Sequence, residues 1–203
     1  TTVKTAREHS WRLGGWAGKD AGGVFDLWDC AGAACGARWQ RKLAGVDVHL
    51  ASTAPGLTVV EPAYTPLAAP HVEAFDRERK VRDHAVIDGV VQAVAPGYLA
   101  ILAPYRVGGS GDDAALKVSA ISAGVGATAW FVEGSDGSEV IWLRDKGSAT
   151  ELTLAGGAVL KTDAELVVID AKGAFALIAR GTFASLDGVE LVSGSGAVTL
   201  KQP

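Results

Sequence analysis

Short segments in which apolar and polar residues alternate, separated by glycine-containing turns, occupy most of the second half of this chain. Residues on alternate positions of a strand face opposite sides of a sheet, and glycine suits the tight turns of hairpins. This spacing therefore predicts an all-β fold, an antiparallel two-layer β-sandwich of many short strands. The segments are 116–120, 127–133, 139–144, 151–154, 158–161, 166–170, 174–179, 181–185 and 189–193.

The chain length is compatible with one domain, since all-β domains of about this size are common as single units. We expect residues 1–203 to form a single β-sandwich domain. Within it, residues 1–70 form a loop-rich part that contains tryptophans and both cysteines, and 71–203 supply the regular antiparallel strands. The charged stretch 71–84 fits a hairpin with a solvated tip better than a helix.

Two segments carry the strongest strand patterns. Residues 98–103 are apolar on both faces, which predicts a central strand covered by other layers and closed by Pro104. Residues 46–50 alternate, so we expect a half-buried strand with its valines and leucine inward and with Asp47 and His49 outward.

The charge and hydropathy of the chain exclude several classes of partner. The net charge is −4 and the pI is about 5.5, so there is no basic footprint for nucleic acid. No apolar run approaches the roughly 20 residues of a membrane-spanning helix. The chain has no methionine and begins at Thr1, so we interpret it as a processed or excised piece. We expect a secreted, periplasmic or extracellular location.

The two cysteines, Cys30 and Cys35, lie in a loop of small residues. Their spacing is not that of a thioredoxin-like motif, and further zinc ligands are missing. A local disulfide is our interpretation for an exported protein, and two reduced, buried thiols are the alternative. The four histidines are isolated, and no cofactor or metal motif occurs.

The apolar strand ending in Pro104-Tyr105-Arg106-Val107-Gly108, after the alternating segment 86–94, resembles the carboxy-terminal β-sandwich of heparinase II/III-like polysaccharide lyases. Residues 8–15, 39–41 and 46–50 are similar to the amino-terminal part of that sandwich. The resemblance implies a helical toroid, as a domain or chain of the same lyase, and an acidic polysaccharide substrate.

The resemblance also implies that most catalytic groups lie outside this chain. Lyases of this family carry a His and a Tyr on the toroid, and a His and a His-x-His-x-x-Asp stretch early in the sandwich. This chain has no His-x-His, and Leu13-Gly14-Gly15 stands where the family often has Leu-His-Gly. We therefore do not expect it to be an active enzyme alone.

Tyr105 and Arg106 are the weak catalytic candidates. An arginine could hold a uronate carboxylate while a tyrosine transfers a proton. Strand neighbours point to opposite faces, however, so the two converge only if the backbone turns. The alternative is structural, with the Tyr105 ring capping the core and Arg106 pairing with a surface acid.

Tryptophans are concentrated in the first 40 residues, and aromatic faces can stack on sugar rings. Trp16, Trp28 and Trp39 are therefore candidates for carbohydrate binding, with burial in the core as the alternative. By contrast, Trp130 and Trp142 lie in alternating segments that predict burial.

The resemblance implies a non-catalytic or cleft-completing β-sandwich domain of a heparinase II/III-like lyase that acts on uronate-containing polysaccharide. The alternative, from a different class, is a structural subunit of an extracellular assembly or fibre. Such a subunit would self-associate through an unpaired strand edge.

Overall fold

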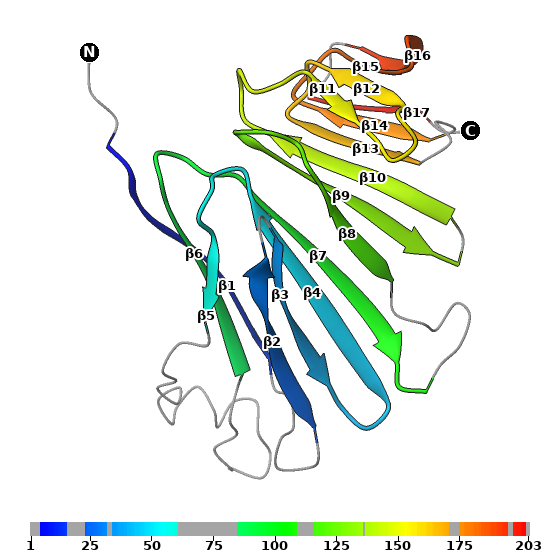
Figure 1. The fold of residues 1–203 in the computed structure, drawn as a ribbon. Helices are drawn as coiled ribbons and strands as arrows, with labels where there is room; N and C mark the ends of the chain where they lie inside the picture. Colours follow the sequence, from blue (N-terminus) through cyan, green and yellow to red (C-terminus); the bar gives the residue numbers. More distant parts are fainter. Residues whose placement is uncertain are drawn as a thin grey trace.

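The computed structural model describes residues 5–15, 23–31, 34–60, 85–108, 116–135, 137–170, 175–194 and 197–201. Within these ranges the chain forms strands and turns and no helix, and all of the strand pairs are antiparallel (Figure 1). The expected all-β antiparallel fold is therefore confirmed. None of the described residues belongs to a helix that is long and apolar enough to cross a membrane.

The first half of the molecule is a sandwich of two sheets. Sheet A has the order β1-β6-β5, and sheet B has the order β2-β3-β4-β7. Their facing sides bury Val48, Leu50, Ile87 and Val91. Sheet A contains β1 (Arg7–Gly15), β5 (Thr58–Val60) and β6 (Ala85–Ala93); sheet B contains β2 (Val24–Ala31), β3 (Ala34–Gln40), β4 (Ala44–Ser52) and β7 (Tyr98–Arg106).

The second half is another two-sheet sandwich, with the order β17-β14-β13-β10-β9-β8 in sheet C and β11-β12-β15-β16 in sheet D. Its core is built around Trp142, Leu160, Val167 and Ile178. Sheet C contains β8 (Lys117–Ile121), β9 (Ala127–Gly134), β10 (Gly137–Arg144), β13 (Leu166–Asp170), β14 (Ala176–Ala179) and β17 (Val198–Lys201); sheet D contains β11 (Glu151–Thr153), β12 (Val159–Thr162), β15 (Phe183–Leu186) and β16 (Val189–Ser193).

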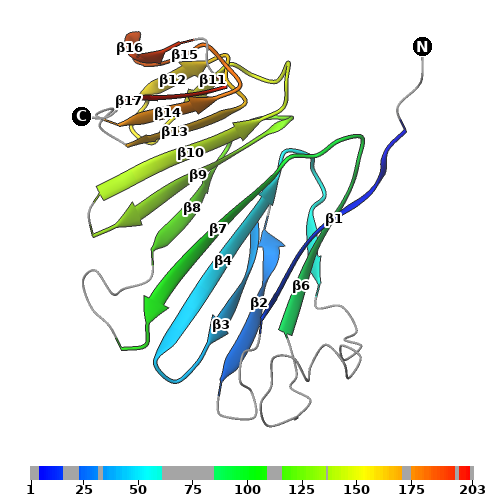
Figure 2. The ribbon, with the colours of Figure 1, turned by 180° about the vertical axis from the view of Figure 1, so that it is seen from behind.

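Sheets B and C join the two halves. Ala51 of β4 packs with Trp130 and Val132 of β9, and Leu99 and Ile101 of β7 extend this contact. A hydrogen bond adds to it, since the Thr53 hydroxyl donates to Asp145 Oδ1 at 2.9 Å. The four sheets thus pack one on the next in the order A, B, C, D, which the two opposite views allow the reader to follow (Figures 1 and 2).

β7 differs from the central strand that the sequence predicted. It is an edge strand of sheet B and pairs only with β4 among the described strands. It is apolar on both faces because Tyr98 and Ala100 pack toward sheet A, whereas Leu99 and Ile101 pack toward sheet C. Pro104 lies inside β7 and does not close it, and an edge strand tolerates the missing amide hydrogen.

The expected division near residue 70 also differs from the architecture. β6 and β7 complete the sheets begun by β1 to β5, so the change from one sandwich to the other falls between Arg106 and Lys117. The described part of residues 1–70 is rich in strands. The charged stretch 71–84, which we predicted to be a hairpin, lies outside the described residues.

Candidate functional site

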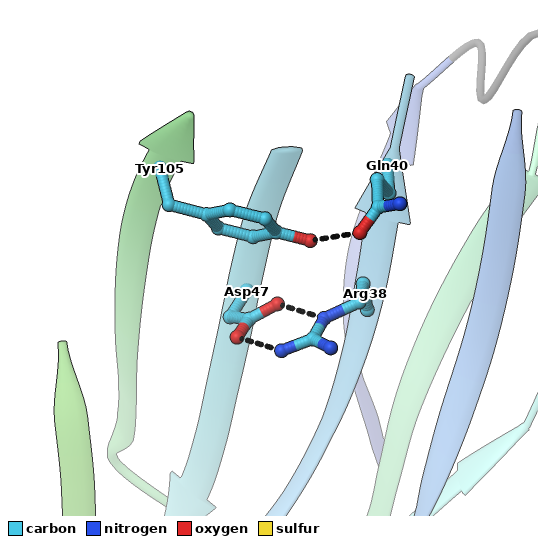
Figure 3. Close-up of polar contacts among 4 residues, drawn as sticks. All are labelled: Arg38, Gln40, Asp47 and Tyr105. Atoms are coloured by element: carbon cyan, nitrogen blue, oxygen red, sulfur yellow. Dashed lines mark hydrogen bonds and ion pairs between the residues drawn. The ribbon is translucent and has the colours of Figure 1, made fainter. Parts of the chain in front are cut away.

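The face of sheet B that is turned away from sheet A packs on sheet C at Ala51 and also carries a ladder of polar side chains. Gln40, Gly45 and Tyr105 stand opposite one another on β3, β4 and β7. Arg38 and Asp47 form the next row on the same face, because side chains two residues apart in a strand point the same way. We call Arg38, Gln40, Asp47 and Tyr105 the polar ladder (Figure 3).

Arg38 and Asp47 form a two-point ion pair. Nε of Arg38 donates to Oδ1 of Asp47 and Nη2 donates to Oδ2, each at 2.6 Å. The sequence predicted Asp47 to face solvent, but the residue is only 4% exposed, whereas the Arg38 side chain is 37% exposed. The hydrogen bonds to Asp47 raise the pKa of Arg38 further above its usual range. The guanidinium is thus a permanent, oriented cation at the surface.

Tyr105 lies across β4 because residue 45 is a glycine. A Cβ at position 45 would come 2.3 Å from Cζ of the Tyr105 ring, so any other residue would displace that ring. The phenol donates to Oε1 of Gln40 at 3.0 Å, and Cζ of Arg38 lies 5.3 Å from the ring centroid (Figure 3). Burial raises the pKa of Tyr105, so the phenol is a neutral hydrogen-bonding group at neutral pH.

His49 follows on the same face and marks where sheet B meets sheet C. Its ring lies edge-on to Trp130, with 6.0 Å between the centroids. Burial lowers the pKa of His49, and Asp47 opposes this effect. The imidazole is therefore neutral near pH 7 and belongs to the contact between the two halves.

The sequence paired Tyr105 with Arg106, but the structure gives Tyr105 a different arginine. As neighbours in β7, Tyr105 and Arg106 project to opposite faces, and Tyr105 meets Arg38 from β3. Sequence reasoning missed Arg38. The turn between β3 and β4, where Arg41 N donates to Ala44 O at 2.8 Å, sets the register that pairs Arg38 with Asp47.

Cations surround the end of sheet B that carries Tyr105. Arg41 and Lys42 lie at the turn between β3 and β4, and Arg106, at the end of β7, pairs with Ala44 beside them. All three side chains belong to exposed residues. We call Arg41, Lys42 and Arg106 the cationic tip. Asp47 and Asp26 lie beside Arg38, so the excess of positive charge at this end of sheet B comes from the cationic tip itself, in a chain whose net charge is −4.

The tryptophan and cysteine candidates have different surroundings. Trp39 is 6% exposed and packs inside the first sandwich, with its ring centroid 4.9 Å from that of Phe25, so it offers no open face to a sugar. Trp16 lies outside the described residues, and only the backbone of Trp28 is described, within β2. Cys35 is buried, and the side chain of Cys30 is outside the described part, so their disulfide stays a prediction.

Among the described residues, no group of three or more His, Cys, Asp and Glu side chains could hold a metal ion. Comparisons with protein-family models, with curated proteins and with solved structures found no match to this chain. The resemblance to heparinase II/III-like lyases therefore stays a prediction from the sequence.

Proposed function

We propose that this chain is a non-catalytic β module of a heparinase II/III-like lyase, and that it completes the cleft for a uronate-containing polysaccharide. The observation that carries the proposal is the cationic tip beside the polar ladder. Arg41, Lys42 and Arg106 gather at the end of sheet B where Arg38 and Tyr105 also lie. Such a surface attracts a polyanion and aligns its carboxylates.

The polar ladder supports binding better than catalysis. Tyr105 is held as a neutral donor to Gln40, and Arg38 is already engaged by Asp47. Neither group is prepared to take a proton from a sugar carbon, since a general base needs a pKa near the working pH. The helical toroid, as a partner domain or chain, would supply the acid and the base.

Binding of a uronate oligosaccharide tests this function. Replacing all three residues of the cationic tip with glutamine, as Arg41→Gln, Lys42→Gln and Arg106→Gln, should weaken binding roughly tenfold or more at low salt. The matched control replaces three exposed cations of the second half, as Lys161→Gln, Arg180→Gln and Lys201→Gln. Both variants lose the same charge. An equal loss of binding affinity in the two would therefore mean that the attraction is not local to sheet B.

An elimination assay separates a binding module from an enzyme. We expect the chain alone to produce no unsaturated uronate, which absorbs in the ultraviolet, from polysaccharides that it binds. Formation of that product at a rate that Tyr105→Phe abolishes would contradict the non-catalytic part of the proposal.

Export and the disulfide belong to the same proposal. Cys30 lies near the end of β2, and β2 pairs with β3, the strand that contains Cys35. A disulfide between the two cysteines would therefore link the two strands of the β2–β3 hairpin. Closing so short a loop stabilises the fold by about 2 kcal/mol. We expect alkylation to add two groups to the intact mass only after reduction, whereas alkylation without reduction would mean free thiols.

A structural subunit is the second candidate, and one observation favours it. β17 ends sheet C and pairs only with β14 among the described strands, and Val198 and Leu200 on it are exposed. An apolar edge of this kind can recruit a strand from another copy. Light scattering that finds a homogeneous polymer of this chain, broken by Leu200→Lys, would favour this candidate over the lyase module.

A further inference from the structure

A cavity of about 380 Å³ lies where the two halves of the molecule meet, away from the polar ladder. One wall is the segment 52–57, which leaves the end of β4, and the other is the segment 120–128, which links β8 to β9. The cavity lies beside the contact of Ala51 with Trp130, because Ser52 and Thr128 belong to its walls. Its volume is within the range of small-molecule sites.

The residues that line the cavity suit an uncharged ligand. None of the described residues that line the cavity carries a charged side chain. An ion placed there would lose its hydration without gaining a counter-charge. The lining residues instead include both aliphatic and hydroxyl-bearing ones: the aliphatic ones include Leu57, Ile121 and Val125, and the hydroxyls belong to Ser52, Thr53, Ser122 and Thr128.

Thr128 is the wall residue whose hydrogen bonding is incomplete. It is 4% exposed, and its hydroxyl makes no hydrogen bond with the described part of the chain. Thr53 is different, because its hydroxyl accepts from the Gly97 amide and donates to Asp145, each at 2.9 Å. The Thr128 hydroxyl oxygen is not among the buried polar atoms that lack a partner, so it keeps some accessible surface at the cavity, and a ligand that hydrogen-bonds it there should gain affinity.

We propose that this cavity binds one neutral pyranose unit. A pyranose has the two kinds of surface that the walls require, because its C–H faces suit the aliphatic side chains and its rim of hydroxyls suits Thr128 and Ser122. The bound sugar would touch both halves of the molecule at once. The site is independent of the polar ladder, since it needs no cation and takes no uronate.

Titration with methyl glucopyranoside, followed by amide NMR, tests the site. The neutral glycoside should give saturable shifts in residues 52–57 and 120–128, and methyl glucuronide at the same pH should not. Thr128→Val keeps the side-chain shape and should weaken binding roughly fivefold. The melting temperature of this variant should also be no lower than that of the wild type, because the lost hydroxyl makes no hydrogen bond with the described part of the chain.

Two further variants keep the test independent of Thr128. Ser122→Trp places a large ring at an exposed wall position and should abolish binding, whereas Ser119→Trp, on the opposite face of sheet C from Thr128, should not. Absence of saturable shifts with the neutral glycoside would overturn the proposal, and so would unchanged affinity in Thr128→Val. Neither result bears on the polar ladder, whose signals at 38–47 are read separately.

Discussion

At the scale of single residues, the polar ladder depends on a residue without a side chain. Gly45 leaves the space that the Tyr105 ring occupies, and the ring then reaches Gln40 on the far side of β4. The arginine that completes the group, Arg38, is held by a buried carboxylate and not by solvent-exposed contacts. Gly45 thus positions the Tyr105 phenol beside Gln40, and the buried Asp47 positions Arg38.

Gly45→Ala tests this dependence. The new methyl group would overlap the ring, so Tyr105 must leave β4 and lose its bond to Gln40. We expect a loss of about 1–3 kcal/mol in the free energy of unfolding, measured by urea denaturation. In a Tyr105→Ala background the same substitution should cost much less. Equal costs in the two backgrounds would contradict this account.

Arg144 gives a second residue-scale prediction. This buried guanidinium donates to the carbonyl oxygens of Ser148, Ala149 and Ala164 at 2.8–3.0 Å. Arg144→Met would leave three acceptors without their donor, so we expect a loss of about 3 kcal/mol or more in the free energy of unfolding. Arg180→Met, at an exposed position, should change it by less than about 0.5 kcal/mol. Similar urea midpoints for the two variants would be inconsistent with this role.

At the scale of elements, the sequence predicted where many of the strands lie, but it did not predict which distant strands pair or which sheets pack together. The segments 166–170 and 189–193 coincide with β13 and β16, because alternation and turn residues are encoded within a few positions. β7 was assigned to the centre of a sheet because both of its faces are apolar. A second sheet covering an edge strand produces the same pattern, and the sequence contains no sign of which sheet that is.

The candidate site was predicted less well than the strands. Tyr105 was found, but its partners Arg38 and Asp47 come from two other strands and meet it only through their register. Trp39 was a candidate for sugar stacking because a tryptophan near glycine-rich loops is compatible with either exposure or burial. Its place on the inner face of β3 decides for burial.

The contact of β4 with β9 predicts a dependence of stability on pH. Burial holds the pKa of His49 below its usual value near 6.5, with Asp47 and Arg38 as the charged groups that act on it from β4 and β3. The unfolded chain therefore binds more protons than the folded one below about pH 6.5, and stability falls as the pH falls. The urea midpoint should decline less steeply in His49→Gln between about pH 7 and pH 5. Parallel declines would contradict this role for His49.

At the scale of the whole molecule, two sandwiches share one interface. Sheets A and B have their own core, sheets C and D have another, and the contact between sheets B and C combines Trp130 packing with the Thr53–Asp145 hydrogen bond. The polar ladder lies on the face of sheet B turned away from sheet A, and the cavity lies where the segments 52–57 and 120–128 meet. The molecule therefore offers a cationic surface and an uncharged cavity at separate places.

The measurement that tests the central claim most directly is an amide NMR titration of the wild-type chain with a uronate oligosaccharide at low salt. The account predicts saturable shifts in residues 38–47 and 104–107, which span the polar ladder and the cationic tip, and their loss at high salt. Signals of sheet D should stay in place. Shifts confined to sheet D, or no shifts at any concentration, would contradict the assignment of sheet B as the polysaccharide surface.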